Sequence, residues 1–212
     1  PIMIASDDDW VNAIILADDG VNQNKTQATL RFKGDWGPHH LSDPRKLSFR
    51  LKITNNDLVF GMSKFSIQRP STRFYQNEAL MLAMMRRIGV LAPRYFFVDV
   101  RINNQKVGIM ALEEHFTKEM VEAQSRRDGP ILAMDEDWIW QQLFLCFKRN
   151  PTTCDNEGLG FSNMEGKDRP VKVFRESGFH PGTVRSQHII RAVSLFRDLI
   201  EGKKDEDFVF DL

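Results

Sequence analysis

The sequence has no long hydrophobic run, no excess of either charge and only two cysteines among its 212 residues. No apolar stretch approaches the about 18 residues that a membrane-spanning helix needs, so no membrane segment is expected. The 29 basic and 29 acidic residues cancel, which argues against general nucleic-acid binding because such proteins usually carry a basic excess. Cys146 and Cys154 could form one bridge, but two thiols spaced in this way provide neither a zinc site nor a disulfide framework.

Several common catalytic motifs are also missing. The sequence contains neither the GxxxxGK[ST] loop nor GxGxxG, which argues against a P-loop or Rossmann enzyme, and no G-x-S-x-G indicates a hydrolase. His39 and His40, with Asp35 or Asp43, could suggest a metal site. Adjacent histidines point apart on an extended chain, however, and no third ligand has a recognisable spacing, so a solvated turn is the better interpretation.

Alternation of apolar and polar residues predicts strands in roughly the first half of the chain, up to residue 114. The stretch RFKGDWGPHH, residues 31–40, would be the tip of a hairpin or a longer strand connection. Asn103 and Asn104 are expected to join the last two strands as a hairpin. The expected strands lie in residues 10–18, 27–34, 47–53, 60–70, 94–103 and 105–114.

The clearest helix is expected over residues 73–88, with Ser71 or Thr72 as its cap and Gly89 as its stop. Its apolar stripe should comprise Phe74, Met81, Leu82, Met85 and Ile88. Glu78 lies on that stripe. A carboxylate there either reaches water at the edge of the stripe or is held by a lysine or arginine of the sheet.

The rest of the chain reads as a polar helical stretch over 115–127, an irregular segment after residue 150 and an amphipathic helix over about 184–201. The fold class expected is α+β, with a mainly antiparallel sheet and one inserted helix. The expected order of elements is several strands, a helix with an inward glutamate, and two strands that end in Glu113 and Glu114. The N-terminal lobe of a protein kinase has the same order, and this likeness is a fold-level analogy.

Four segments in order, LRFKGDW, KLSFRLKI, FGMSKFSIQRP and the run from Tyr75 to Phe116, resemble the spore-coat protein H (CotH) kinase family. The resemblance covers residues 28–135, about half of the chain. Within it, Gly108 to Glu113 is similar to a family strand of pattern G-x-Y-x-L-x-E, with Met110 in place of the aromatic residue. The likeness is strongest to a bacterial branch that carries KGDW, ALEEHF and RR-x-GP.

This resemblance implies an atypical kinase that transfers the γ-phosphoryl group of ATP to protein side chains with a divalent metal, Mg or Mn. The implied partners are a nucleotide and a coat or surface protein, and the implied location is the spore coat, the cell surface or another extracytoplasmic site. Residues 1–115 would form the kinase-like lobe, and 116–212 would be a connecting segment and the beginning of the second lobe.

The resemblance also implies a set of nucleotide-binding residues. RFKGDW would be the glycine-bearing turn over the nucleotide, where Gly34 permits close approach of the backbone. Glu78 would be the helical partner of a phosphate-binding cation, although the strand before the helix carries Arg69 where kinases usually have a lysine. The implied residues are Lys33, Gly34, Lys46, Arg50, Lys52, Arg69, Glu78 and Glu113.

Family members place their catalytic Asn-bearing loop and a Trp-Asp-x-Asp motif after this region, and neither occurs before Leu212. The catalytic groups are therefore expected beyond Leu212, and this chain is expected not to transfer phosphate by itself. One alternative is a non-catalytic coat or surface module for assembly or binding with a kinase-like fold. Another is single-strand nucleic-acid binding by Arg31, Lys33, Trp36 and Arg45.

Overall fold

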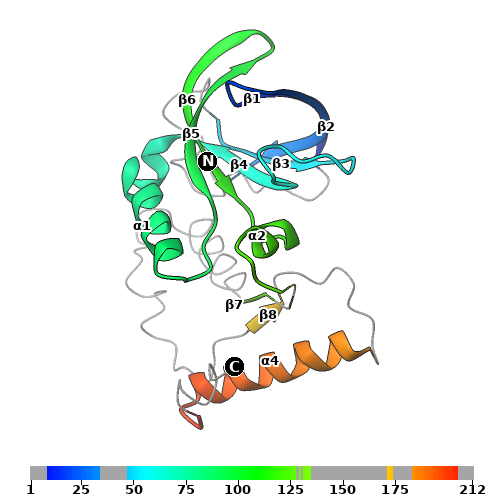
Figure 1. Ribbon diagram of the computed structural model, residues 1–212, viewed down its shortest axis with the longest axis vertical. Coiled ribbons are helices and arrows are strands. Elements are labelled where there is room, and N and C mark those ends of the chain that lie inside the picture. Colours follow the sequence, from blue (N-terminus) through cyan, green and yellow to red (C-terminus); the bar gives the residue numbers. More distant parts are fainter. Residues whose placement is uncertain are drawn as a thin grey trace, which may run out of the picture. The chain divides into compact units, whose positions relative to one another are not determined.

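The computed structural model describes residues 9–33, 47–127, 129, 131–134, 171–173 and 183–204. The chain divides into two compact units, Pro1–Asp128 and Gly129–Leu212. Within the described residues, the first unit holds a six-stranded sheet and two α-helices, and the second holds a two-stranded sheet and one longer helix (Figure 1).

The large sheet is antiparallel throughout, in the spatial order β1-β2-β3-β4-β6-β5. Chain order is broken only at the end, because helix α1 (Gln76–Arg87) carries the chain from β4 to the outer edge, where β5 starts and β6 returns beside β4. The predicted α+β class with an inserted helix is therefore confirmed. The strands are β1 (Val11–Asp18), β2 (Gln23–Phe32), β3 (Phe49–Ile53), β4 (Lys64–Gln68), β5 (Tyr95–Ile102) and β6 (Gln105–Glu114).

The sheet has one apolar and one polar face, as the alternation predicts. In β3, Leu51 and Ile53 are buried whereas Lys52 between them is exposed. Residues paired in register lie on the same face, so the apolar face continues across the strands into a single core. Each large apolar side chain buried there contributes about 1.5–3 kcal/mol. The buried cluster comprises Ala28, Leu51, Ile53, Val59, Met62, Phe65 and Leu112.

Helix α1 departs from its prediction at its start. A 3₁₀ turn, η2 (Pro70–Arg73), precedes it, and the expected caps Ser71 and Thr72 lie inside that turn. Phe74 and Tyr75 then have φ of 53° and 59°, which no right-handed helix allows, so α1 starts only at Gln76. The predicted stop is confirmed. Gly89 has φ of 83°, and the bonds from its N–H to the Arg86 carbonyl and from Val90 N–H to the Met85 carbonyl form a Schellman ending.

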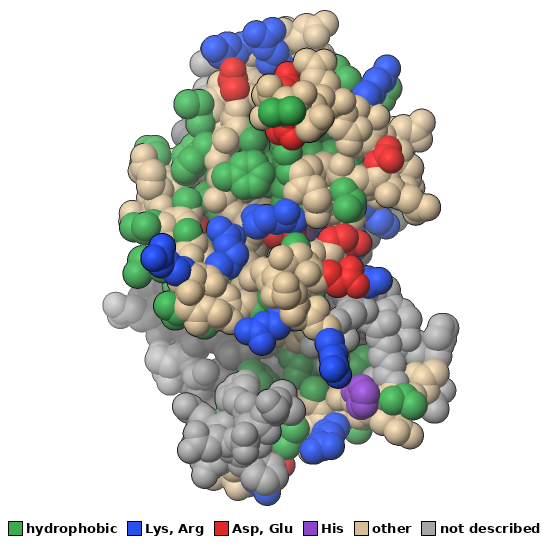
Figure 2. All heavy atoms as spheres, in the orientation of Figure 1, with side chains coloured by type: hydrophobic (Ala, Val, Ile, Leu, Met, Phe, Trp, Pro, Cys, Tyr) green, Lys and Arg blue, Asp and Glu red, His purple; other side chains and the backbone are tan. Residues whose placement is uncertain are grey.

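The buried side of α1 is also different from the predicted stripe. Leu82 and Met85 are half-buried, but Phe74, Met81 and Ile88 are more than half exposed. The helix is apolar on several sides, so sequence periodicity could not single out the side that meets the sheet. Figure 2 shows hydrophobic side chains at the surface of this unit, and Leu80 and Met84 of α1 are among the exposed ones.

Strands β5 and β6 form the expected hairpin across Asn103 and Asn104. Both asparagines have positive φ, 49° and 66°, as a two-residue turn that matches the strand twist requires. A register shift between Val100 and Arg101 marks a bulge near the tip. Figure 1 shows this hairpin curling beyond the other strands.

The expected helix over 115–127 is shorter than predicted. Helix α2 runs only from Lys118 to Ala123, with Thr117 accepting a hydrogen bond from Met120 N–H at 3.4 Å. In the second unit, α4 (Val184–Ile200) confirms the last predicted helix, and Thr183 caps it by accepting from Ser186 N–H at 3.2 Å.

Strands β7 (Leu132–Met134) and β8 (Val171–Val173) of the second unit pair in an antiparallel arrangement. The sequence did not predict them, since three residues are too few for an alternation to be visible. No helix within the described ranges is long and apolar enough to cross a membrane.

Candidate functional site

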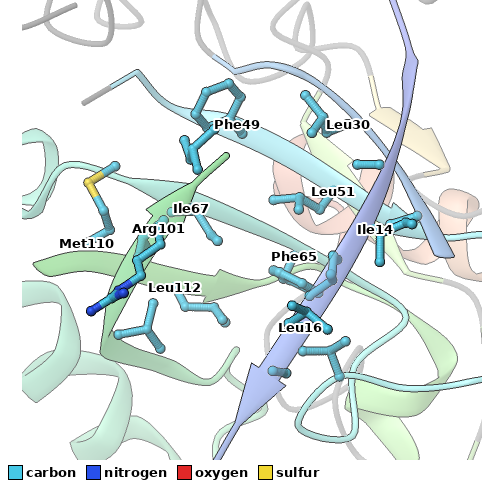
Figure 3. Close-up of a pocket in the computed structure, with 18 of the residues that line it drawn as sticks. Ile14, Leu16, Leu30, Phe49, Leu51, Phe65, Ile67, Arg101, Met110 and Leu112 are labelled. Carbon is cyan, nitrogen blue, oxygen red and sulfur yellow. The ribbon is translucent and has the colours of Figure 1, made fainter. Parts of the chain in front are cut away.

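The apolar face of the sheet carries a large trough of about 1440 Å³. Its charged lining residues, Asp18, Asp99 and Arg101, are all exposed. Among the described residues, the lining of the trough therefore offers no buried charged group that could perform acid–base chemistry or hold phosphate. Its labelled lining residues in Figure 3 are Ile14, Leu16, Leu30, Phe49, Leu51, Phe65, Ile67, Arg101, Met110 and Leu112.

The polar face gathers charged and polar groups from five strands, because the register aligns them in one row. That row comprises Arg31, Arg50, Ser66, Glu113 and Tyr95. Beside it lies a second row that includes Lys33 and Gln68. The backbone N–H of Lys33 donates to the Ser48 carbonyl at 2.8 Å, which aligns Lys33 with that row. Ser48, Ser66 and Gln68 have no exposed surface, so the long cationic side chains of the rows lie over a buried polar floor.

Lys33 and Glu113 form the central contact of this face. Lys33 Nζ lies 2.5 Å from Glu113 Oε2, and only 12% and 18% of the two side chains is exposed. Gln68 Nε2 donates to the same carboxylate oxygen at 3.0 Å. The ion pair joins the end of β2 to β6, two segments 80 residues apart in the sequence.

The two partners of this pair are perturbed by burial and by each other. Burial lowers the pKa of Lys33, and the nearby Glu113 charge offsets this only in part. Burial alone would raise the pKa of Glu113, but the charge and hydrogen bond of Lys33, with Arg73 and His115, hold that pKa below its usual value. Glu113 is therefore ionised at neutral pH, while burial of the Lys33 ammonium costs free energy that an additional anion would reduce.

Two buried polar atoms beside the pair have no hydrogen-bond partner in the described part of the chain, Gln68 Oε1 and the Tyr95 hydroxyl. Burial raises the pKa of the Tyr95 phenol, and the neighbouring Gln68 side chain opposes that rise. Gln68 and Tyr95 are thus neighbours that stop short of a hydrogen bond. Unsatisfied buried polar groups are uncommon in folded proteins, and they are more frequent where a site binds a ligand or water.

His115 continues the polar face beyond the end of β6. Its Nε2 lies 2.6 Å from Ser66 Oγ. Burial, followed by the positive charges of Arg50 and Lys33, lowers the pKa of His115 to about 3. The histidine is therefore neutral at pH 7, and its depressed pKa reflects its burial first and the positive charges of this face second.

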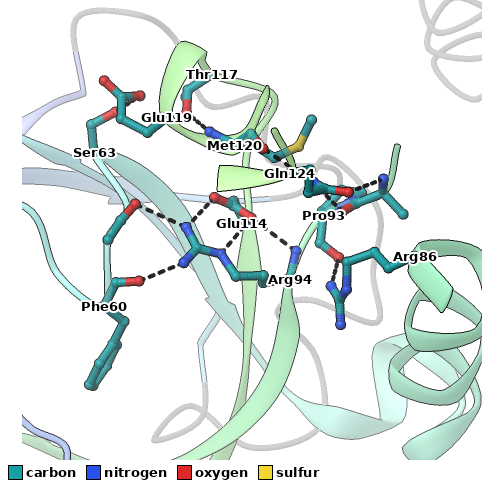
Figure 4. Close-up of polar contacts among 12 residues, drawn as sticks. Phe60, Ser63, Arg86, Pro93, Arg94, Glu114, Thr117, Glu119, Met120 and Gln124 are labelled. Carbon is teal, nitrogen blue, oxygen red and sulfur yellow. Dashed lines mark hydrogen bonds and ion pairs between the residues drawn. The ribbon is translucent and has the colours of Figure 1, made fainter. Parts of the chain in front are cut away.

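On the apolar side of the sheet, an ion pair between Arg94 and the buried Glu114 holds the end of β6 in place. Arg94 Nη2 lies 2.5 Å from Glu114 Oε1, and Arg94 Nε donates to Glu114 Oε2 at 2.9 Å (Figure 4). The same guanidinium donates to the carbonyls of Phe60 and Gly61. Because Glu113 and Glu114 are consecutive on a strand, this anchor on the apolar side also positions Glu113 on the polar side.

The structure brings together some, but not all, of the residues implied by the resemblance. Lys33, Arg50 and Glu113 gather on the polar face. Lys52 lies on the same face, but it is exposed and pairs in register with Lys64 rather than with the Glu113 row. Arg69 is 5% exposed and precedes η2.

Glu78 is half-buried on α1, and among the described residues it forms no ion pair with a lysine or arginine of the sheet. Its charge raises the pKa of Tyr95, which places it at the margin of the same face. Gly34 and Lys46, and the candidate metal residues His39 and His40, lie outside the described residues.

Four residues of this face were missed by sequence reasoning. Gln68 and Tyr95 occupy polar positions in the alternating patterns of β4 and β5. This pattern alone does not indicate a site, because only the strand register shows that both residues lie beside Glu113. His115 follows the last strand of the large sheet, and Arg73, expected as the first residue of the helix, instead ends a 3₁₀ turn.

The described residues contain no group of three or more His, Cys, Asp or Glu that could hold a metal ion. The described residues at the polar face include four cationic side chains but only two carboxylates. The cations are Lys33, Arg31, Arg50 and Arg73, and the carboxylates are Glu113 and Glu78. This arrangement is suited to binding an anion rather than a cation.

Comparison with curated proteins found no match. The family model described as CotH kinase protein matches residues 30–208, which extends well past the segments that carry the resemblance. It includes the site's pair of Lys33 and Glu113 and leaves out β1. Because the match covers most of the chain, the chain belongs to the CotH kinase family.

Proposed function

We propose that the polar face of the six-stranded sheet holds the phosphates of ATP, and that the whole protein transfers the γ-phosphoryl group to protein side chains. Family membership supports a kinase-related function. The order of β2 to β4, then α1, then the β5–β6 hairpin is that of a kinase N-terminal lobe, which is support by analogy.

The observation that carries the proposal is the Lys33–Glu113 pair. A lysine held by a carboxylate, largely shielded from water and facing a cationic surface, matches the arrangement that positions ATP phosphates in kinases. Here the carboxylate comes from strand β6, whereas in protein kinases it comes from the inserted helix.

The residues present fit the nucleotide phosphates better than they fit the metal. Among the described residues of this face, cations exceed carboxylates, and Mg or Mn prefers clustered oxygen ligands. We therefore assign phosphate binding to Lys33 and Arg50, and no metal ligand within the described residues. The bound metal would neutralise phosphate charge during transfer. The protein acceptor is proposed to be a coat or surface protein, as the family name suggests.

The test is calorimetric titration of the chain with Mg-ADP, comparing Lys33→Met with Lys25→Met. Lys25 lies on β2, the strand that Lys33 directly follows, but it is exposed and away from Glu113. Losing one charge-assisted contact to phosphate should weaken binding about 10- to 100-fold for Lys33→Met, and Lys25→Met should bind like the unaltered chain. Thermal melts check that both variants are folded.

Two results would contradict the proposal: no ADP binding by the unaltered chain, or equal affinities for the two variants. Absence of nucleotide binding would favour a non-catalytic coat or surface module that keeps the kinase-like fold.

A further inference from the structure

We propose that Arg73, the last residue of η2, is a second phosphate-binding cation of the polar face and acts together with Lys33 on one polyphosphate. This inference rests on the proposed function, because it names a residue of the same site that neither the sequence motifs nor the family match assigns.

The position of Arg73 follows from how η2 packs. This turn contacts β6 as well as α1, so η2 lies beside the strand that carries Glu113. The charge of Arg73 acts on Lys33, Glu113 and Tyr95, which belong to the end of β2, to β6 and to β5. Because η2 packs on β6 and the Arg73 charge acts on all three residues, Arg73 lies close to the polar face.

Arg73 is also available for a ligand. It is exposed, and within the described ranges it forms no hydrogen bond or ion pair. Glu113 is already bonded to Lys33 and Gln68. The Glu113 carboxylate on which the Arg73 charge acts is therefore already paired, and the guanidinium of Arg73 can meet a further anion near the buried Lys33.

The local backbone restricts where Arg73 can point. Pro70 fixes the first turn of η2, and Thr72 Oγ1 donates to the Arg69 carbonyl at 2.7 Å. The following residues, Phe74 and Tyr75, are both held at positive φ, a conformation that is uncommon and strained for such side chains. The backbone that carries Arg73 is therefore restrained before a ligand binds. Less conformational entropy of this segment is then lost when the guanidinium binds a ligand.

The chemistry indicates phosphate as the ligand. A guanidinium presents planar paired donors that match two phosphate oxygens, and an ammonium beside it supplies a point charge. Lys33 is paired with Glu113, and the charges of Arg73 and Arg50 both act on Lys33. A diphosphate between them would relieve the repulsion that these cations exert on Lys33.

The experiment measures binding of pyrophosphate, Mg-ADP and adenosine to the full chain by calorimetry. Arg73→Gln is compared with Arg87→Gln, an exposed arginine at the other end of α1. Loss of one charge-assisted contact should weaken pyrophosphate and ADP binding about 10- to 100-fold in Arg73→Gln. Arg87→Gln should stay within about twofold of the unaltered chain, and Arg73→Lys should recover only part of the loss. Any adenosine binding should be unchanged by Arg73→Gln.

The outcomes separate this inference from the function on which it rests. If Arg73→Gln binds pyrophosphate and ADP like Arg87→Gln while Lys33→Met has lost binding, the role of Arg73 is wrong and the proposed function stands. If the unaltered chain binds neither ligand, both fall. A fall in ADP affinity that leaves pyrophosphate affinity unchanged would also overturn the inference, because Arg73 would then contact the nucleoside.

Discussion

Removal of Arg94 should be among the most destabilising single changes in the first unit. Its guanidinium and backbone N–H together satisfy both oxygens of Glu114, whose side chain is 1% exposed, and the guanidinium also satisfies two carbonyls of the β3–β4 turn. Arg94→Met keeps most of the stem but leaves the Glu114 carboxylate buried without its cation. Breaking a buried pair in this way costs about 3–5 kcal/mol, a large share of the roughly 5–15 kcal/mol that stabilises a typical domain.

Urea unfolding followed by fluorescence measures the free energy of unfolding. The control is Lys106→Met on the β5–β6 hairpin, because Lys106 and Asp99 are 3.9 Å apart and mostly exposed; this change should cost less than about 0.5 kcal/mol. The double variant Arg94→Met, Glu114→Leu should be more stable than Arg94→Met alone, since no buried charge is left unpaired. A loss below about 1 kcal/mol for Arg94→Met, or strictly additive losses in the double variant, would refute the reasoning.

Two further predictions concern His115 and Gly61. Burial, then the charges of Arg50 and Lys33, lower the pKa of His115 from 6.5 to about 3, so below pH 6.5 the unfolded chain binds a proton that the folded chain does not. The free energy of unfolding should therefore fall between pH 6.5 and 5, by up to about 1.4 kcal/mol per pH unit; an equal slope in His115→Gln would contradict this. Gly61 has φ of 74°, and an added Cβ would lie 3.2 Å from Arg94 Nη1. In thermal melts Gly61→Ala should therefore destabilise more than Gly89→Ala, which has a similar φ of 83° but open space; equal losses would show that the contact is unimportant.

The strands were predictable because apolar and polar residues alternate where one face is buried, as in Leu51, Lys52 and Ile53. The start of α1 was not, because nothing in the residue types of Phe74 and Tyr75 signals positive φ. The buried side of α1 was missed for a different reason. Apolar residues occur on several sides of this helix, so tertiary packing rather than periodicity decides which side meets the sheet.

The site was predictable only in part. Lys33 and Glu113 could be named from the family resemblance, but their contact depends on strand register over 80 residues of chain. Gln68 and Tyr95 carry no motif, and only the pairing of β4, β6 and β5 shows that they border the same carboxylate. Local spacing encodes local structure, and it cannot indicate which distant residues a sheet will align.

The most direct test of the account is to locate the bound nucleotide by NMR titration of the chain with Mg-ADP. We expect the Gln68 side-chain amide and the rings of Tyr95 and His115 to shift, because they lie on the polar face around Lys33 and Glu113. The methyl groups of Met110 and Leu112, which line the apolar trough, should not move. Saturable shifts at Met110 and Leu112 without shifts at Gln68 and Tyr95 would place the nucleotide on the opposite face and contradict the central claim.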